Sequence, residues 1–221
     1  MSEEVLIPKM KRLDNKQKKI KIPLLNLLLI FVCTVLLVAS TFINIDLKHY
    51  IIPPGLFSNK NFRPEDCVYG FSIIPQIPVV MFVCSFVGKK MSASCIMLYL
   101  MLGLAGFPFF ALGGGLSYIK EYGFGYLLAY IPAIIVAGIF LNKKYSILNM
   151  FLTSLCGVLI IHFCGILYMV LVALIRHDGG TFISGWIYSQ SGMKVLYDFV
   201  LSFVAVIIGG YLHSFLKFIT D

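Results

Sequence analysis

Three polar side chains near the carboxyl end of the chain follow one another at intervals of four residues: Lys194, Asp198 and Ser202. In a helix this spacing places all three on one face. A cation, a carboxylate and a hydroxyl on one face can bind a small polar molecule; the structural alternative is that Asp198 only anchors the helix by pairing with Lys194. An ionisable group in a membrane span costs at least about 2.5 kcal/mol at the bilayer centre and less near its surface. These side chains are therefore the first candidates for a ligand site.

The second candidate region is the glycine cluster Gly113, Gly114 and Gly115, with Tyr126 at the start of the apolar stretch that follows. Three consecutive glycines remove side chains and permit positive φ, so the backbone can approach another group closely. In lipid, irregular backbone survives only where it is buried in protein or lines a cavity. We therefore expect the three glycines and Tyr126 to contact a ligand.

Two further polar residues lie inside apolar stretches. Gln76 stands between Pro75 and Pro78, and it either bonds backbone that the prolines leave open or contacts the ligand. His162 falls near the middle of a long apolar run, where a histidine could relay protons. We find no acidic partner for it within the membrane, and expect a hydrogen bond to a neighbouring helix, for example with Asn26 or a Ser/Thr.

Motifs of several common catalysts are absent from the sequence. It contains no GxxxxGK[ST] phosphate loop, no HExxH and no GxSxG. Its six cysteines form no CxxC or Cys/His metal spacing, so they are interpreted as small packing residues. We expect no catalytic residue, metal site or cofactor.

The composition is that of a polytopic membrane protein. Hydrophobic residues make up 59% of the chain and charged residues 13%, too few charges to cover a soluble domain of this length. We predict an all-α fold with six transmembrane helices in a membrane domain at 22–219. Breaks at charges, Pro and Gly give the spans as about Ile22–Ile45, Phe71–Val87, Ser92–Phe110, Phe124–Leu141, Ile147–Ile175 and Val195–Ile219.

Charge placement predicts the orientation. A basic tail at 1–21 precedes the first span, and Lys89-Lys90, Lys143-Lys144 and Lys217 fall on the same side. By the positive-inside rule both termini are cytoplasmic, in a plasma-membrane protein, and the tail attracts anionic lipid rather than nucleic acid. The predicted outer loops contain the long segment Asp46–Gly70, which either covers a ligand or is a disordered connector. A further outer loop carries Trp186, Tyr188 and Gln190, whose aromatic members are expected to lie at the membrane surface.

A family resemblance appears over about 74–138. The run Leu-Gly-x-x-Gly-x-Pro-x-Phe at 102–110, the glycine cluster, the Gly-Tyr-Leu at 125–127 and the upstream segment IPQIPVVMFVCSFVGKKMS are similar to the BioY family. BioY proteins are the biotin-specific substrate-binding (S) components of energy-coupling-factor (ECF) transporters. The resemblance implies the S-component fold, a ligand cavity on the outer side and biotin as the ligand. It also implies partners, namely a membrane-embedded coupling protein and two ABC-type ATPases that hydrolyse the ATP.

The resemblance also carries over to the last helix, with one departure. In the family an Asp followed three positions later by Lys opens this helix and contacts the ligand. Asp198 matches the first position, but Leu201 stands at the second. Because Asp198 alone would repel the biotin carboxylate, another cation must replace the missing lysine. Lys194, one turn earlier, is our choice, and Arg176 is the alternative.

Three rival functions stay open at this point. The same fold could bind another small vitamin, which the missing lysine favours. A small membrane-embedded enzyme could use Asp198 and His162, but their predicted depths in the membrane differ, whereas a reacting centre needs both within about 3 Å of one substrate. A structural or assembly factor would leave the clustering of polar residues without a purpose.

Overall fold

The computed structural model describes residues 24–50, 68–141 and 146–220. The basic tail at 1–21, the middle of the predicted outer loop and the turn at Lys143-Lys144 lie outside the described residues. The elements, in chain order, are α1 (Leu24–Thr41), β1 (Ile45–Tyr50), β2 (Val68–Ile73), α2 (Gln76–Leu104), the short 3₁₀-helix η2 (Leu116–Lys120), α3 (Phe124–Leu141), α4 (Ile147–Arg176), α5 (Gly180–Ser191) and α6 (Lys194–Thr220).

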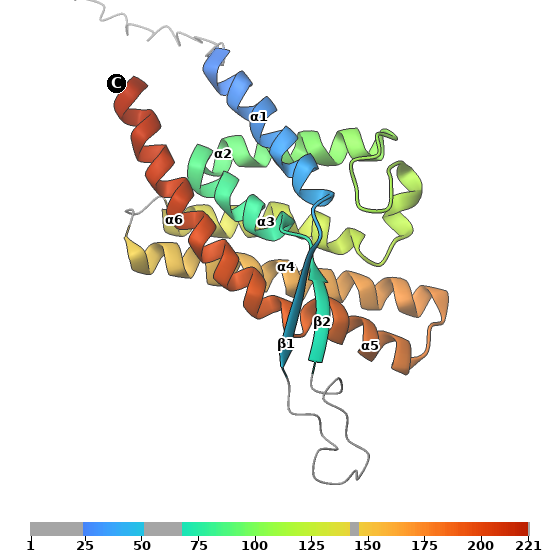
Figure 1. The fold of residues 1–221 in the computed structure, drawn as a ribbon. Coiled ribbons are helices and arrows are strands. Elements are labelled where there is room, and N and C mark those ends of the chain that lie inside the picture. Colours follow the sequence, from blue (N-terminus) through green and yellow to red (C-terminus); the bar gives the residue numbers. More distant parts are fainter. Residues whose placement is uncertain (1–23, 51–67, 142–145, 221) are drawn as a thin grey trace, which may run out of the picture.

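The predicted membrane helices are present, and two of them form the arms of one bent helix. α2 turns sharply at Gly88, whose φ of 80° and ψ of 164° are not helical. Figure 1 shows the two arms of α2 running in different directions. A glycine adopts this positive φ without the steric cost that a Cβ would bring. When α2 is counted once, the described residues contain five helical stretches long and apolar enough to span a membrane.

Helix packing forms one bundle around a buried core. α3 packs along α4, and α2 packs against both α6 and α1. Glycines allow two close approaches: a Cβ on Gly125 would lie 2.2 Å from the Cβ of Tyr168, and one on Gly165 would lie 2.6 Å from the ring of Tyr126. The second approach brings Tyr126 of α3 against the middle of α4, where His162 is located.

Three expectations about local structure were wrong. α1 ends at Thr41 rather than Ile45, and β1 and β2 form an antiparallel hairpin in the predicted outer loop, with Ile45 opposite Ile73. The helix before the glycine cluster ends at Leu104 rather than Phe110.

A further expectation, of a loop between the last two spans, was also wrong, because this segment forms a helix. Trp186, Tyr188 and Gln190 belong to α5, which runs back beside α4 before α6 begins (Figure 1). Together α5 and α6 form one apolar stretch, Gly180–Phe218. The start of α6 therefore lies deeper in the bundle than the end of α4.

The glycine cluster serves close packing of the backbone. Gly113 and Gly115 adopt φ of 109° and 98°, and the amide of Gly115 donates to the carbonyl of Gly103 at 2.8 Å. A Cβ on Gly114 would lie 2.0 Å from the carbonyl oxygen of Phe107. This loop folds back on the end of α2, and no side chain fits at its central position.

Replacing Gly114 with alanine should therefore destabilise the protein. The added Cβ meets a backbone atom that cannot rotate away, and overpacking of this kind costs typically about 1–3 kcal/mol. We expect Gly114→Ala to melt several degrees below the wild type in a detergent thermal-stability assay. Gly123→Ala is the matched control, because a Cβ there meets nothing within 4 Å. Equal melting temperatures for the two variants would contradict the packing role.

Candidate ligand cavity

A cavity of about 340 Å³ lies where the amino-terminal ends of α2, α3 and α6 meet the middle of α4 and the end of α5. Its volume falls at the lower end of the range usual for small-molecule sites. Apolar and aromatic side chains make up most of its wall, and several of the aromatic ones carry a polar atom. The polar and charged side chains in the lining are Gln76, Tyr118, Glu121, Tyr122, Tyr126, Tyr130, His162, Trp186, Gln190, Lys194 and Asp198.

Four of the seven predicted site residues line this cavity: Gln76, Tyr126, Lys194 and Asp198. The three glycines of the cluster are not among the lining residues. Their loop instead places Ala111 and Leu112 at the wall. Because glycine has no side chain, its backbone can approach any neighbour closely, and here that neighbour is the end of α2.

The carboxylate of Asp198 pairs with His162 across the bundle. His162 Nε2 lies 3.1 Å from Asp198 Oδ2, and the exposed fraction is only 4% for each residue. The expectation that His162 has no acidic partner was therefore wrong, and so was the argument that the two residues lie at different depths. The other oxygen, Asp198 Oδ1, is buried and has no hydrogen-bond partner among the described residues.

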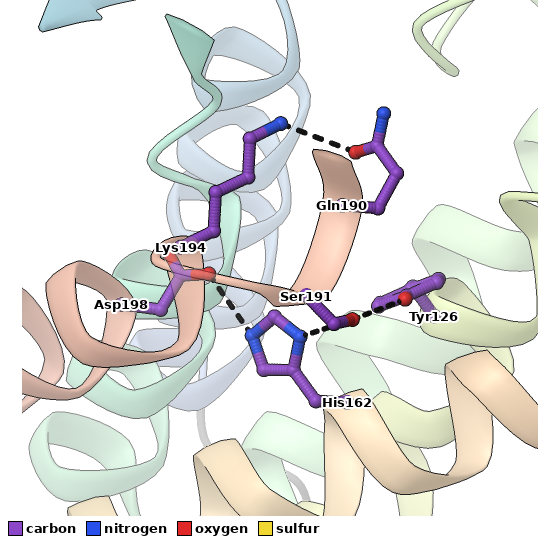
Figure 2. Close-up of polar contacts among 6 residues, drawn as sticks. All are labelled: Tyr126, His162, Gln190, Ser191, Lys194 and Asp198. Carbon is purple, nitrogen blue, oxygen red and sulfur yellow. Dashed lines mark hydrogen bonds and ion pairs between the residues drawn. The ribbon is translucent and has the colours of Figure 1, made fainter. Parts of the chain in front are cut away.

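A chain of hydrogen bonds continues from His162 to the opposite wall. His162 Nδ1 lies 2.9 Å from Ser191 Oγ, and Ser191 Oγ lies 2.6 Å from the hydroxyl of Tyr126. Figure 2 shows the four side chains in a line from α6 through α4 and the end of α5 to α3. The hydrogen bond expected between His162 and a Ser/Thr is thus present, with Ser191 as the partner. One buried histidine links three other helices.

Lys194 lies at the same wall, one turn before Asp198. Its Nζ donates to Gln190 Oε1 at 3.2 Å, and within the described ranges no ion pair joins it to Asp198 (Figure 2). The structural alternative, in which Asp198 serves only to anchor the helix against Lys194, was wrong. Its hydrogen-bond partner is a neutral amide, and no described carboxylate lies within ion-pair distance of the ammonium, so Lys194 can meet an anion.

Arg176, the alternative cation, does not line the cavity. Its guanidinium donates to the carbonyl of Lys120 at 2.6 Å and lies 4.4 Å above the ring of Tyr122. Tyr122 in turn donates to Asp178 Oδ2 at 2.6 Å. Arg176 therefore supports the wall residue Tyr122 from outside the cavity. Among the lining residues that the structure describes, Lys194 is the one with a cationic lysine or arginine side chain.

Gln76 lies at the inner end of the cavity, with an exposed fraction of 6%. Its Nε2 donates to Thr41 Oγ1 at 2.9 Å and to the Tyr99 hydroxyl at 2.8 Å, and its Oε1 accepts from the Tyr130 hydroxyl at 3.0 Å. Its partners are side chains of α1, α2 and α3 rather than kinked backbone. Both amide hydrogens are used, so a ligand finds at most a free lone pair on Oε1.

The aromatic wall was only partly predicted. Tyr118, Tyr122, Tyr126 and Tyr130 follow one another at intervals of four residues, and all four line the cavity. Only Tyr126 and Tyr130 share a helix, α3, whereas Tyr118 lies in η2 and Tyr122 in the turn before α3. The spacing could therefore have identified Tyr130, but not Tyr118 or Tyr122. Trp186 of α5 closes this wall, with its ring centroid 5.8 Å from that of Tyr126. Burial raises the pKa of Tyr118 to about 12, so its hydroxyl stays protonated at physiological pH.

A family model described as the BioY family matches residues 14–218. The chain belongs to the BioY family. A curated relative, "Probable biotin transporter BioY" of Lysinibacillus sphaericus, is 27% identical over 96 residues, which are 42% of this chain and 49% of the relative. The chain thus matches about half the length of that relative.

The BioY fold is supported independently by a solved structure. The crystal structure at 2.1 Å of the S-component for biotin from an ECF-type ABC transporter matches with a TM-score of 0.61 and 19% identity. The match covers 86% of this chain and 90% of the other. This BioY-family chain therefore has the S-component fold of a multi-pass membrane protein.

Replacing Gln76 with leucine should destabilise the empty protein. The substitution removes the acceptor of the Tyr130 hydroxyl, while Thr41 and Tyr99 keep bonds to the carbonyls of Leu37 and Phe109. An unsatisfied buried group costs about 1–3 kcal/mol. We expect Gln76→Leu to lower the melting temperature in ligand-free detergent solution by several degrees. Gln190→Leu is the control, because Gln190 is exposed and makes one bond, to Lys194. An unchanged melting temperature for Gln76→Leu would show that the bonds of Gln76 do not stabilise the fold.

Proposed function

We propose that the protein is a substrate-binding S component that takes up biotin together with an ATP-driven energy-coupling module. The observation that carries this proposal is the cavity itself: one lysine, a buried carboxylate and an aromatic wall in a chain of the BioY family. The names of the relative and of the solved structure, both of which refer to biotin, support the same ligand.

The chemistry of biotin suits the lining. Its fused bicycle needs an apolar, preferably aromatic, surface, which Tyr122, Tyr126 and Trp186 supply. Its valerate carboxylate needs a cation, and the ammonium of Lys194 is available at the wall. Its ureido N–H groups need acceptors, and Asp198 Oδ1 is a buried acceptor that has no partner in the described part of the chain. A buried polar atom of this kind costs free energy until a donor reaches it.

The position of Leu201 explains why another residue must supply the cation. Leu201 is 38% exposed and is not among the lining residues. Lys194 lies in the lining on the same helix, before Asp198 rather than after it. We therefore propose Lys194 as the carboxylate partner, and Gln76, Tyr126 and Asp198 as further ligand contacts. The three glycines shape the loop beside the cavity.

The remaining assignments follow from this function and from charge placement. We propose that 22–219 form the membrane domain and that 1–21 are a cytoplasmic tail, in a protein of the cell membrane with both termini inside. A coupling protein and ABC-type ATPases would supply the energy. A different small vitamin is the second candidate ligand, because Leu201 replaces the lysine expected in the family.

Equilibrium binding of biotin to the purified protein tests the proposal directly. Trp186 is the only tryptophan of the chain and lines the cavity, so its fluorescence should change as biotin binds. We expect saturable binding that weakens when biotin methyl ester replaces biotin. A folded, monodisperse sample that binds no biotin would overturn biotin as the ligand, and the same assay with other vitamins would then identify the ligand.

The carboxylate partner is tested by substitution. Lys194→Gln should weaken biotin binding about tenfold or more, because a hydrogen bond to a charged group is worth about 1.5–3 kcal/mol. The same variant should bind biotin methyl ester about as well as the wild type. Lys120→Gln is the control, because Lys120 is exposed and outside the lining. If Arg176→Gln rather than Lys194→Gln abolishes the preference for the acid, the assignment to Lys194 is wrong.

A further inference from the structure

The buried chain from Tyr126 to Asp198 has a direction that the donors and acceptors determine. An ionised Asp198 carboxylate can only accept, so His162 Nε2 must carry a hydrogen and donate to Oδ2. What remains open is whether Nδ1 also carries a hydrogen. With a neutral ring Nδ1 accepts from Ser191, and with a charged ring it donates to Ser191.

Counting the hydrogens of the chain favours the neutral ring over the charged one. With a neutral ring, Tyr126 donates to Ser191, Ser191 donates to Nδ1, and Nε2 donates to Asp198, so every hydrogen has an acceptor. With a charged ring the chain has one hydrogen too many, so one hydroxyl hydrogen, that of Tyr126 or that of Ser191, has no acceptor among the described residues. An unsatisfied donor costs about 1–3 kcal/mol. The neutral ring with hydrogen on Nε2 leaves no donor of the chain unsatisfied.

We infer that His162 is a positioning residue that makes the cavity specific for ligands with N–H donors. It fixes Asp198 by one oxygen and leaves the other, Oδ1, as a free acceptor. Through Ser191 it also turns the hydroxyl hydrogen of Tyr126 away from the cavity, so that Tyr126 presents an oxygen lone pair. This inference rests on the proposed function and deepens it, because the ureido ring of biotin carries two N–H donors.

The arrangement requires a group that donates on one side and accepts on the other. Such a group holds Asp198 and Ser191 at once, and His162 does so from the middle of α4, with an exposed fraction of 4%. The ring of Tyr126 packs edge-on against it, with centroids 5.7 Å apart. The acceptor character of this wall of the cavity therefore depends on His162, although the atoms that meet the ligand belong to Asp198 and Tyr126.

Binding of matched analogues tests the inference. The probes are biotin, the two cyclic carbamates in which one ring N–H is replaced by oxygen, and the analogue in which the ring sulfur is replaced by oxygen. The wild type should bind biotin at least about tenfold more tightly than the carbamates, because an oxygen then faces an acceptor. The sulfur-replaced analogue keeps both N–H groups and should bind about as well as biotin.

Substitution of His162 then separates positioning from folding. His162→Phe should lose at least about tenfold in biotin affinity and most of the preference for biotin over the carbamates. His162→Gln keeps one donor and one acceptor, and should retain that preference to within about threefold. Ser191→Ala should reduce the preference while leaving Asp198 held. A folded His162→Phe with the affinity and preference of the wild type would overturn the inference.

A spectroscopic measurement decides the matter without any ligand. In protein labelled with nitrogen-15 in the histidine rings, the signals that disappear in His162→Gln report His162. Nδ1 should be an unprotonated, accepting nitrogen whose signal moves in Ser191→Ala. A protonated Nδ1 would overturn the inference. If the wild type binds no biotin, the proposed function fails, and this measurement still tests the role of His162.

Discussion

The whole arrangement depends on one constraint: a polar group inside an apolar bundle must find its partner within the protein. Water is not available there, and an unsatisfied group costs several kcal/mol in lipid. Most buried hydroxyls satisfy this constraint by donating to backbone carbonyls, and two buried residues, Gln76 and His162, satisfy it by joining side chains of different helices. Gln76 joins α1, α2 and α3 through three hydroxyls, and His162 joins α4 to α5 and α6. The cavity lies between Gln76 and His162, so the bonds that stabilise the bundle also fix the walls of the cavity.

The membrane spans could be predicted because hydropathy alone determines them. α3 has the predicted bounds, and α4 differs by one residue. The contact between His162 and Asp198 could not be found in the same way. Depth was assigned by counting from the helix ends, and His162 lies about 21 Å from the end of α4 at 1.5 Å per residue. The 12 residues of α5 run back about 18 Å along α4. α6 therefore begins near the level of His162. The predicted loop would have placed the start of α6 at the level of the end of α4 instead.

The candidate site was predictable where helical spacing carried the signal. Lys194 and Asp198 share a face, and both reach the cavity. The glycine cluster carried a signal of another kind, because glycine permits close approach without saying to what. Its neighbour proved to be the backbone of Phe107 and Gly103 rather than a cavity. Tyr126 and Tyr130, one turn apart in α3, carry the same helical signal, whereas Tyr118 and Tyr122 reach the wall from η2 and the turn that follows it.

The replacement of a lysine by Leu201 illustrates why the fold is easier to predict than the specificity. The fold depends on many apolar residues, any of which can change at small cost. Recognition of a carboxylate depends on one cation, whose position along the helix can move by a turn if the side chain still reaches the cavity. Leu201 is partly exposed and Lys194 lies in the lining, so the charge can be retained although the motif is not. A comparison with the family pattern, position by position, misses a lysine at 194 that replaces one at 201. The placement of side chains around the cavity reveals it.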